Sequence, residues 1–249
     1  MASSTAREDT VPLVAPRRKL SIELARRRPD LPDPDRLIRA GRVLVDGAVV
    51  TNPDSMVLPG SAIALDDPAP LRGTLKLGPA LDRFGVDPRG RVCLDAGASA
   101  GGFTSTLLER GVRRVYAVDV GFGQLLGSLR QDERVVNLER TNVAHLDTRL
   151  VPDPVDLVTL DLGYLSLADG VPQLGALNYA PGADLVALVK PMFELRLGEP
   201  PDDRATLDEA LHRATDGVER AGWHVEESMD SPVRGGGGAA ELFLHALRG

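Results

Sequence analysis

The alternation of strand-like and helix-like segments over the last two thirds of the chain constrains its fold most strongly. Apolar runs such as RVCLDAG at 91–97 and VDLVTLDL at 155–162 alternate with helix-like segments such as GGFTSTLLERG at 101–111. Strands that alternate with helices along a chain form mainly parallel sheets, and helices then cover both faces. The sequence therefore predicts an α/β domain built on such a sheet.

Seven strands are expected in this domain. Five come first, and a helix at 206–222 separates them from the other two. The expected strands are 91–97, 113–121, 134–139, 155–162, 184–191, 223–229 and 240–247. In open α/β sheets, ligands bind at the carboxyl ends of the strands. Polar residues at those ends are therefore candidate functional residues.

A smaller α/β module is expected before this domain. Leu20 and Leu24 have helical spacing within 17–27, and a second, Asp-capped helical turn ends at Gly41. Alternating valines around an Asp-Gly pair then predict a β-hairpin. The expected organisation is a disordered N-terminus at 1–16, the small module at 17–67, a linker at 68–75 and the large domain at 76–249.

Charge and composition narrow the range of functions. The net charge is −7, yet residues 17–42 hold nine basic and four acidic residues, so this window has a net charge of +5. A local basic surface on an acidic protein is therefore expected. The single cysteine excludes an internal disulfide framework, and the four histidines show no metal-site spacing. No apolar stretch has the length of a signal peptide or a membrane helix, which favours a cytoplasmic protein.

The stretch LDAGASAGGFT at 94–104 is typical of a ligand-binding turn between a strand and a helix. Glycines let a ligand approach the backbone, and a helix start offers free N–H groups. Asp119, 24 residues after Asp95, ends the next strand and can accept hydrogen bonds from ribose hydroxyls. The pattern is not G-x-G-x-x-G, so a dinucleotide is disfavoured and S-adenosylmethionine is expected. The alternative is a glycine-rich turn that binds no ligand.

Charged residues end two later strands. Lys190 follows the apolar run 186–189, and Asp161 ends the strand before it. Both are expected to face the crevice at the carboxyl edge of the sheet. Each also has a simpler interpretation, because Lys190 could mark the point where its strand reaches solvent and Asp161 could cap a helix. Taken alone, Lys76 is typical of a solvated lysine and Glu241 of an edge charge.

Together these stretches resemble the TlyA family, whose members join an S4 RNA-binding domain to an FtsJ-like, S-adenosylmethionine-dependent methyltransferase domain. The resemblance covers about 17 to 248 and rests on the order of several segments. They are LIRAGRVLVDGAVV, GTLKLGPALDRFGV, VCLDAGASAGGFTSTLLERG, VYAVDVGFGQLLGSLRQDERVVNLERTNV, LVTLDLGYLSL, LVKPMFE and AAELFLHAL. It implies a Rossmann-like methyltransferase domain behind a small S4-like domain. The family is known for 2′-O-methylation of ribosomal RNA, and some members also carry the name haemolysin.

The resemblance also implies roles for particular residues. The family's Lys-Asp-Lys-Glu catalytic tetrad matches Lys76, Asp161, Lys190 and Glu241. The implied S-adenosylmethionine-binding residues are Asp95, Gly97, Ser99, Gly101, Gly102, Asp119 and Asn142. The expected RNA-binding residues are Arg17, Arg18, Arg26, Arg39, Arg42 and Arg72, and no metal is expected.

The implied partner is ribosomal RNA or a ribosomal subunit, without a membrane span. Several family motifs are altered: the S-R-G-G stretch is LRGTLK, S-T-G-G-F is SAGGF, A-D-L-S-F is LDLGY, and PDLPDPDR replaces the Ser-Arg of the S4 helix. These departures and the acidic charge leave a small biosynthetic molecule open as the substrate. A non-enzymatic haemolysin or RNA-binding protein is a further alternative, against which the complete tetrad argues.

Overall fold

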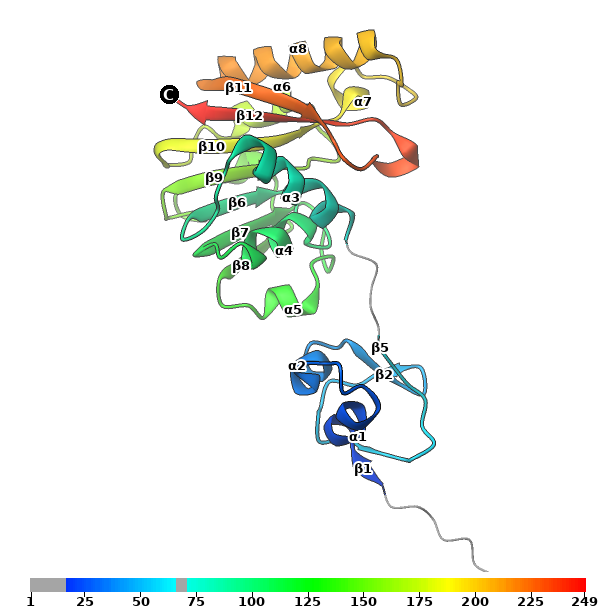
Figure 1. Ribbon diagram of the computed structural model, residues 1–249. Helices are drawn as coiled ribbons and strands as arrows, with labels where there is room; N and C mark the ends of the chain where they lie inside the picture. Colours follow the sequence, from blue (N-terminus) through cyan, green and yellow to red (C-terminus); the bar gives the residue numbers. More distant parts are fainter. Residues whose placement is uncertain (1–16, 66–70) are drawn as a thin grey trace, which may run out of the picture. The chain divides into compact units, whose positions relative to one another are not determined.

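The computed structural model describes residues 17–65 and 71–249, and the chain divides into two compact units, Met1–Ala69 and Pro70–Gly249 (Figure 1). The segment 1–16, expected to be disordered, lies outside the described residues. The first three residues of the expected linker, 68–70, also lie outside them.

The first unit is a small α/β module with its own core. Its core residues are Leu20, Leu24, Ile38, Val43 and Val57. Its elements are α1 (Leu20–Arg27), α2 (Pro34–Arg39), the three-stranded sheet β3 (Ala48–Val49), β2 (Val43–Val45) and β5 (Ile63–Leu65), and the pair β1 (Arg18–Lys19) and β4 (Met56–Val57). The pair of β1 and β4 was not predicted, because two-residue strands are too short to show an alternating pattern.

Local chemistry explains the turns of this unit. Asp46 and Gly47 have φ values of 50° and 84°, and two successive positive values are the mark of a type I′ hairpin turn. The side chain of Asp33 accepts a hydrogen bond from the Arg36 backbone N–H and so caps α2. The predicted hairpin and the predicted capped helix are both confirmed.

The second unit is built on a seven-stranded sheet in the order β11-β12-β10-β9-β6-β7-β8. The strands are β6 (Val92–Ala96), β7 (Arg114–Asp119), β8 (Val135–Glu139), β9 (Val155–Leu160), β10 (Tyr179–Val189), β11 (Trp223–Asp230) and β12 (Leu242–Arg248). Strands β8, β7, β6, β9 and β10 are parallel, whereas β12 runs antiparallel to both of its neighbours. All seven predicted strands are present, and the predicted α/β architecture is confirmed.

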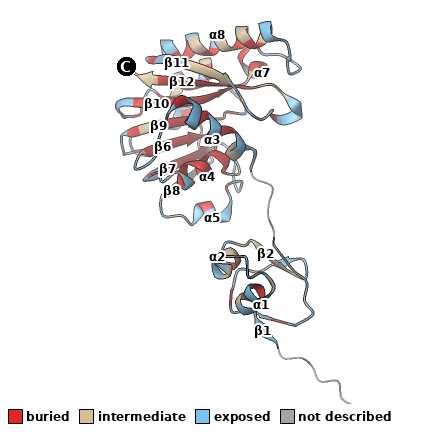
Figure 2. Cartoon of the chain, in the orientation of Figure 1, coloured by how far each residue is buried: buried red, intermediate tan, exposed pale blue. Residues whose placement is uncertain are grey.

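Helices cover both faces of this sheet, and the strands between them are mostly buried (Figure 2). On one face, α3 (Arg72–Phe84) and α4 (Gly102–Glu109) pack through residues such as Leu77 and Phe103. On the other face, α8 (Arg204–Arg220) packs through Leu207 and Val218. The remaining helices are α5 (Gly127–Arg130), α6 (Leu167–Gly170), α7 (Pro191–Glu194) and the 3₁₀ segments η1 (Val143–His145), η2 (Val171–Leu174) and η3 (Gly236–Gly238).

Helix α3 begins four residues before the expected start of the large domain. It starts at Arg72, so part of the segment expected as linker is helical. Its first turn lies directly on the start of α4, because a Cβ atom on Gly102 would come within 2.7 Å of the Gly73 Cα. Two glycines therefore let the two helix backbones touch. This contact fixes the helix turn that precedes Lys76.

Among the described residues, no helix has both the length and the apolar character needed to cross a bilayer.

Candidate active site

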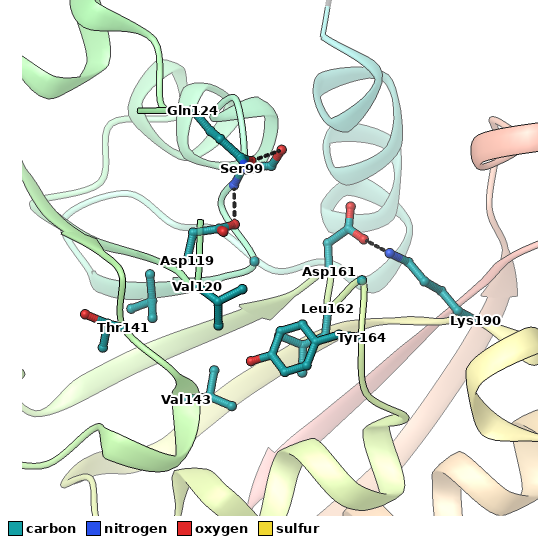
Figure 3. Close-up of a pocket in the computed structure, with 13 residues that line it drawn as sticks. Ser99, Asp119, Val120, Gln124, Thr141, Val143, Asp161, Leu162, Tyr164 and Lys190 are labelled. Carbon is teal, nitrogen blue, oxygen red and sulfur yellow. Dashed lines mark hydrogen bonds and ion pairs between the residues drawn. The ribbon is translucent and has the colours of Figure 1, made fainter. Parts of the chain in front are cut away.

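A cavity of about 430 Å³ opens where β6, β7, β9 and β10 end (Figure 3). One wall is apolar and includes Val118, Val120, Val143 and Leu162, with Tyr164 beside them. The other lining residues are Gly97, Ser99, Asp119, Gln124, Thr141, Asp161, Gly163 and Lys190. The cavity thus combines an apolar surface with a few polar groups, which is the usual composition of a small-molecule site.

The glycine-rich turn after β6 contributes Gly97 and Ser99 to this cavity. Gly97 has a φ of 88°, and a Cβ atom there would lie 2.4 Å from the carbonyl oxygen of Asp161. Any side chain at Gly97 would therefore push the β6 and β9 loops apart. Gly101 and Gly102 do not line the cavity. A Cβ atom on Gly101 would collide with Leu129, and Gly102 lies against Gly73.

Asp119 lies at the end of β7 with its carboxylate beside the turn (Figure 3). One of its oxygens accepts a hydrogen bond from the Ser99 N–H at 2.8 Å, and the other accepts from the Gly121 N–H at 2.7 Å. Each carboxylate oxygen can accept more than one hydrogen bond. Asp119 is therefore held in place and can still accept hydrogen bonds from a ligand.

Asp95 is a further predicted ligand-binding residue that does not line the cavity. Its side chain is fully buried and accepts hydrogen bonds from the hydroxyls of Thr104 at 2.6 Å and Thr159 at 3.1 Å. Burial raises the pKa of Asp95 to about 6, against the effect of both hydroxyls. The side chain of Asp95 therefore links β6 to α4 and to β9 through hydrogen bonds, and it does not face the cavity.

Asn142 is also engaged elsewhere. Its side-chain oxygen accepts a hydrogen bond from the Ala144 N–H at 2.9 Å and caps η1. Its neighbours Thr141 and Val143 line the cavity, whereas Asn142 is not among the lining residues.

The four residues of the expected tetrad form two ion pairs. The Lys190 ammonium lies 2.5 Å from an Asp161 oxygen, and the Lys76 ammonium lies 2.6 Å from a Glu241 oxygen. The Lys76–Glu241 pair is almost completely buried, with side-chain exposures of 7% and 6%. The Lys190–Asp161 pair is more open, with exposures of 18% and 24%. Only this second pair lines the main cavity, so it is the more accessible to a reactant.

Two smaller hollows adjoin the main cavity and bring the two pairs into one region. One, of about 280 Å³, is lined by Lys76, Asp161 and the first turn of α3, including Arg72. The other, also about 280 Å³, is lined by Lys190, Glu241, Met192 and Phe193. Asp161 and Lys190 each border the main cavity and one hollow. A second reactant could therefore reach the lysines without entering the main cavity.

Sequence reasoning missed several residues of the site. Gln124 accepts a hydrogen bond from the Ser99 hydroxyl. In the sequence, only its place in the segment that begins VYAVDVGFGQ could have indicated a role in the site. Glu194 is buried, and its carboxylate accepts a hydrogen bond from the Leu167 N–H. It thereby ties α7, which follows Lys190, to α6, which follows the loop after Asp161. No local pattern distinguishes such a buried carboxylate from a surface one.

The predicted RNA-binding arginines fall into both units. In the first unit, Arg18 and Arg26 both contact the buried Glu23, while Arg17 and Arg39 are exposed and Arg42 is partly buried. Arg72 belongs to the second unit and lines the hollow that contains Lys76. Within the described residues, no group of three or more His, Cys, Asp or Glu residues could hold a metal ion.

Comparison with known proteins gives two family matches. Residues 70–245 match the FtsJ-like methyltransferase family, and residues 35–63 match the S4 domain. The first match covers the whole seven-stranded sheet except the end of β12. The second covers nearly all of α2, then β2, β3 and β4, and ends at the first residue of β5.

Individual relatives match most of the chain. It is 42% identical over 217 residues to the 16S/23S rRNA (cytidine-2′-O)-methyltransferase TlyA of Mycobacterium tuberculosis, covering 84% of this chain and 81% of the relative. It is 30% identical to Hemolysin A of Brachyspira hyodysenteriae, and the match covers 85% of this chain and 91% of the relative. The solved structure named "Putative hemolysin from Streptococcus thermophilus" superposes with a TM-score of 0.68 at 28% identity. The superposition covers 94% of this chain and 89% of that structure.

The raised pKa of Asp95 predicts how its substitution changes stability. Between about pH 4 and 6 the folded protein binds more protons at Asp95 than the unfolded chain does, so this residue makes stability fall as pH rises. A shift to about 6 corresponds to roughly 3 kcal/mol. Asp95→Asn can still accept from a threonine hydroxyl and lacks this titration. Denaturant unfolding at pH 4.5 and 7.5 should therefore show the variant gaining stability relative to wild type at the higher pH.

Asp82→Asn provides a control without this pH dependence. Hydrogen bonding to Arg110 lowers the pKa of Asp82, so its contribution to stability changes with pH only below about pH 4 and is constant between pH 4.5 and 7.5. Parallel pH profiles for wild type and Asp95→Asn would contradict the prediction.

Proposed function

This chain belongs to the FtsJ-like methyltransferase family, and we propose that it transfers methyl groups from S-adenosylmethionine to ribose 2′-hydroxyls of ribosomal RNA. The observation that carries the proposal is that Lys76, Asp161, Lys190 and Glu241 form two ion pairs around the main cavity and the two hollows beside it. A ribosomal RNA substrate implies a cytoplasmic location, which forms part of the same proposal.

The main cavity suits S-adenosylmethionine. Its volume of about 430 Å³ lies within the range of roughly 300–1,000 Å³ for small-molecule sites. Asp119 has acceptor capacity for ribose hydroxyls, and the apolar wall with Tyr164 can pack against an adenine. Helix α4 has no acidic residue in its first turn, so its N–H groups favour a carboxylate nearby. Gly97, Ser99 and Asp119 are therefore the residues proposed to hold the donor.

Lys190 is proposed as the group that manages the proton of the 2′-hydroxyl. When bound, S-adenosylmethionine supplies an electrophilic methyl group, which the ribose oxygen takes up as its proton leaves. Neutral Lys190 can accept that proton as a general base, whereas its ammonium form can stabilise the developing alkoxide. Asp161, 2.5 Å from the Lys190 ammonium, fixes the position of this group. Positioning of this kind supplies a large part of the rate of a methyl transfer.

Lys76 and Glu241 are proposed to support this pair from inside the fold. Each neutralises the charge of the other, because an unpaired charge in so buried a position would be costly. Lys76 shares one hollow with Asp161, and Glu241 shares the other with Lys190, so this pair contributes to the electrostatic environment of the reacting hydroxyl.

The test of the proposed function is methyl transfer from labelled S-adenosylmethionine to purified 30S and 50S ribosomal subunits. We expect label in RNA of at least one subunit, recovered as a 2′-O-methylated nucleoside after nuclease digestion. A panel of small hydroxylated molecules run in parallel checks the alternative substrate class. Transfer to a small molecule without transfer to either subunit would contradict an RNA substrate.

Asp119→Ala should weaken binding of S-adenosylmethionine by about fivefold or more, because a lost charged acceptor costs roughly 1–3 kcal/mol. Asp147→Ala is the matched control. Asp147 likewise accepts hydrogen bonds from two backbone N–H groups, those of Arg149 and Leu150, and it does not line the cavity. Calorimetry should find wild-type affinity for the control. Equal affinities for the two variants would remove Asp119 from the binding site.

Lys190→Ala should fold, bind S-adenosylmethionine and lose methyl transfer by about 10²-fold or more, the usual scale for a positioned proton-transfer group. Lys190→Arg should restore little activity, because guanidinium keeps its proton at neutral pH and has a different shape. The measurement for both variants is the single-turnover rate of methyl transfer to the ribosomal subunit that the wild-type protein methylates. Near-normal turnover by the arginine variant would show that positive charge alone is needed, and near-normal turnover by the alanine variant would exclude a catalytic role.

Gly235→Ala should displace the Glu241 carboxylate and thereby reduce methyl transfer by about tenfold or more. A Cβ atom at Gly235 would lie 2.2 Å from a Glu241 oxygen, and this flexible side chain can move without unfolding the protein. Affinity for S-adenosylmethionine should stay unchanged, because Glu241 does not line the main cavity. Gly198→Ala, where a Cβ atom meets nothing within 4 Å, is the control. Unchanged turnover in Gly235→Ala would show that the position of Glu241 is unimportant.

A further inference from the structure

A single buried carboxylate in the first unit organises three arginines. Arg26 contacts Glu23 with two nitrogens, at 3.1 and 2.6 Å, and Arg27 contacts it at 2.7 Å. Arg18 completes the group at 3.4 Å. We call these four residues the Glu23 cluster. One carboxylate and three guanidiniums leave the cluster with a net charge of +2.

Glu23 is only 1% exposed, although it lies among exposed basic residues. Hydrogen bonds from Arg26, followed by those from Arg27, lower the pKa of Glu23 to about 2. The carboxylate is therefore ionised throughout the physiological pH range. A buried carboxylate is unfavourable without such partners.

The three arginines differ in how many of their N–H groups remain available. Arg27 also donates to the carbonyl oxygens of Ser61 and Pro59, at 2.8 and 2.9 Å, so it joins α1 to the chain segment before β5. Among the described residues, Arg18 and Arg26 make no such second side-chain hydrogen bond, and their side chains are 50% and 56% exposed. Each guanidinium carries five N–H groups. Arg18 and Arg26 thus keep donors that can face a ligand.

We propose that Glu23 is a positioning residue that holds Arg18 and Arg26 as a fixed phosphate-binding surface for RNA. This inference rests on the proposed RNA substrate and deepens it. A free arginine side chain loses rotamer freedom when it binds a phosphate. Arginines already held by Glu23 have lost that freedom on folding. The cluster keeps its +2 charge and offers guanidinium groups that bind phosphate with defined geometry.

The proposal predicts an effect opposite to simple electrostatics. RNA binding is driven largely by its phosphates, so removing a negative charge from the protein should by itself strengthen binding. If Glu23 acts by positioning, however, its neutralisation frees Arg18 and Arg26 and weakens binding. The sign of the change therefore separates the two explanations.

The experiment measures binding of the full-length protein to fluorescently labelled, deproteinised ribosomal RNA over a range of salt concentrations. Glu23→Gln should weaken binding threefold or more at about 0.15 M salt. Asp54→Asn is the matched control, because it removes the same charge from the same unit. Asp54 pairs with Lys19 at 2.7 Å but is exposed, so its neutralisation should leave binding unchanged or slightly tighter. Arg26→Ala should lower the slope of affinity against salt by about one.

Two measurements keep the result interpretable. Circular dichroism and thermal unfolding check that Glu23→Gln folds, and binding of S-adenosylmethionine reports on the second unit. Glu23→Asp keeps the charge but is shorter by one methylene, so it cannot reach all three guanidiniums and should also weaken RNA binding. Equal or tighter binding by Glu23→Gln, wild-type binding by Glu23→Asp, or unfolding of the first unit in both variants would overturn the proposal. Wild type that does not bind ribosomal RNA would instead contradict the proposed substrate.

Discussion

The buried ion pair between Lys76 and Glu241 is the constraint on which the arrangement of the second unit depends. It joins the first helix of that unit to the start of β12, across 165 residues of sequence. Either charge alone would be costly at this depth, because removal of one partner leaves the other unpaired. Helix α3 must therefore lie where Lys76 can reach Glu241. The contact between Gly73 and Gly102 allows that position, and Gly235 leaves room for the carboxylate.

Pairing of both lysines also determines how the site can attract RNA. Two lysines and two carboxylates sum to no net charge, so these four residues offer little long-range attraction for phosphate. The excess of acidic residues in the whole chain adds to this effect. Under the proposed function, most of the attraction for RNA must come from other basic groups. The Glu23 cluster supplies two of these in the first unit, and Arg72 supplies one beside Lys76.

Local sequence patterns predicted most of the fold and the strand ends that carry the site. Alternation located all seven strands, and the apolar run before Lys190 indicated the crevice. Asp95 was expected at the ligand, yet a five-residue strand gives no sign of which face its side chain takes once β9 and α4 pack beside it. Glu23 was counted as one acidic residue in a basic window. Its contact with Arg27, which in turn reaches Ser61, depends on tertiary structure that no local pattern contains.

The position of β12 has a consequence for the order of folding. It lies between β10 and β11, although β11 precedes it in sequence, so β11 has no place in the sheet until β12 is present. The two strands therefore join as a hairpin, and only this step delivers Glu241 to Lys76. Contacts between distant parts of a chain form slowly. An intermediate with five parallel strands could contain the main cavity and still lack the Lys76–Glu241 pair of the proposed catalytic site, so ligand affinity would precede turnover during refolding.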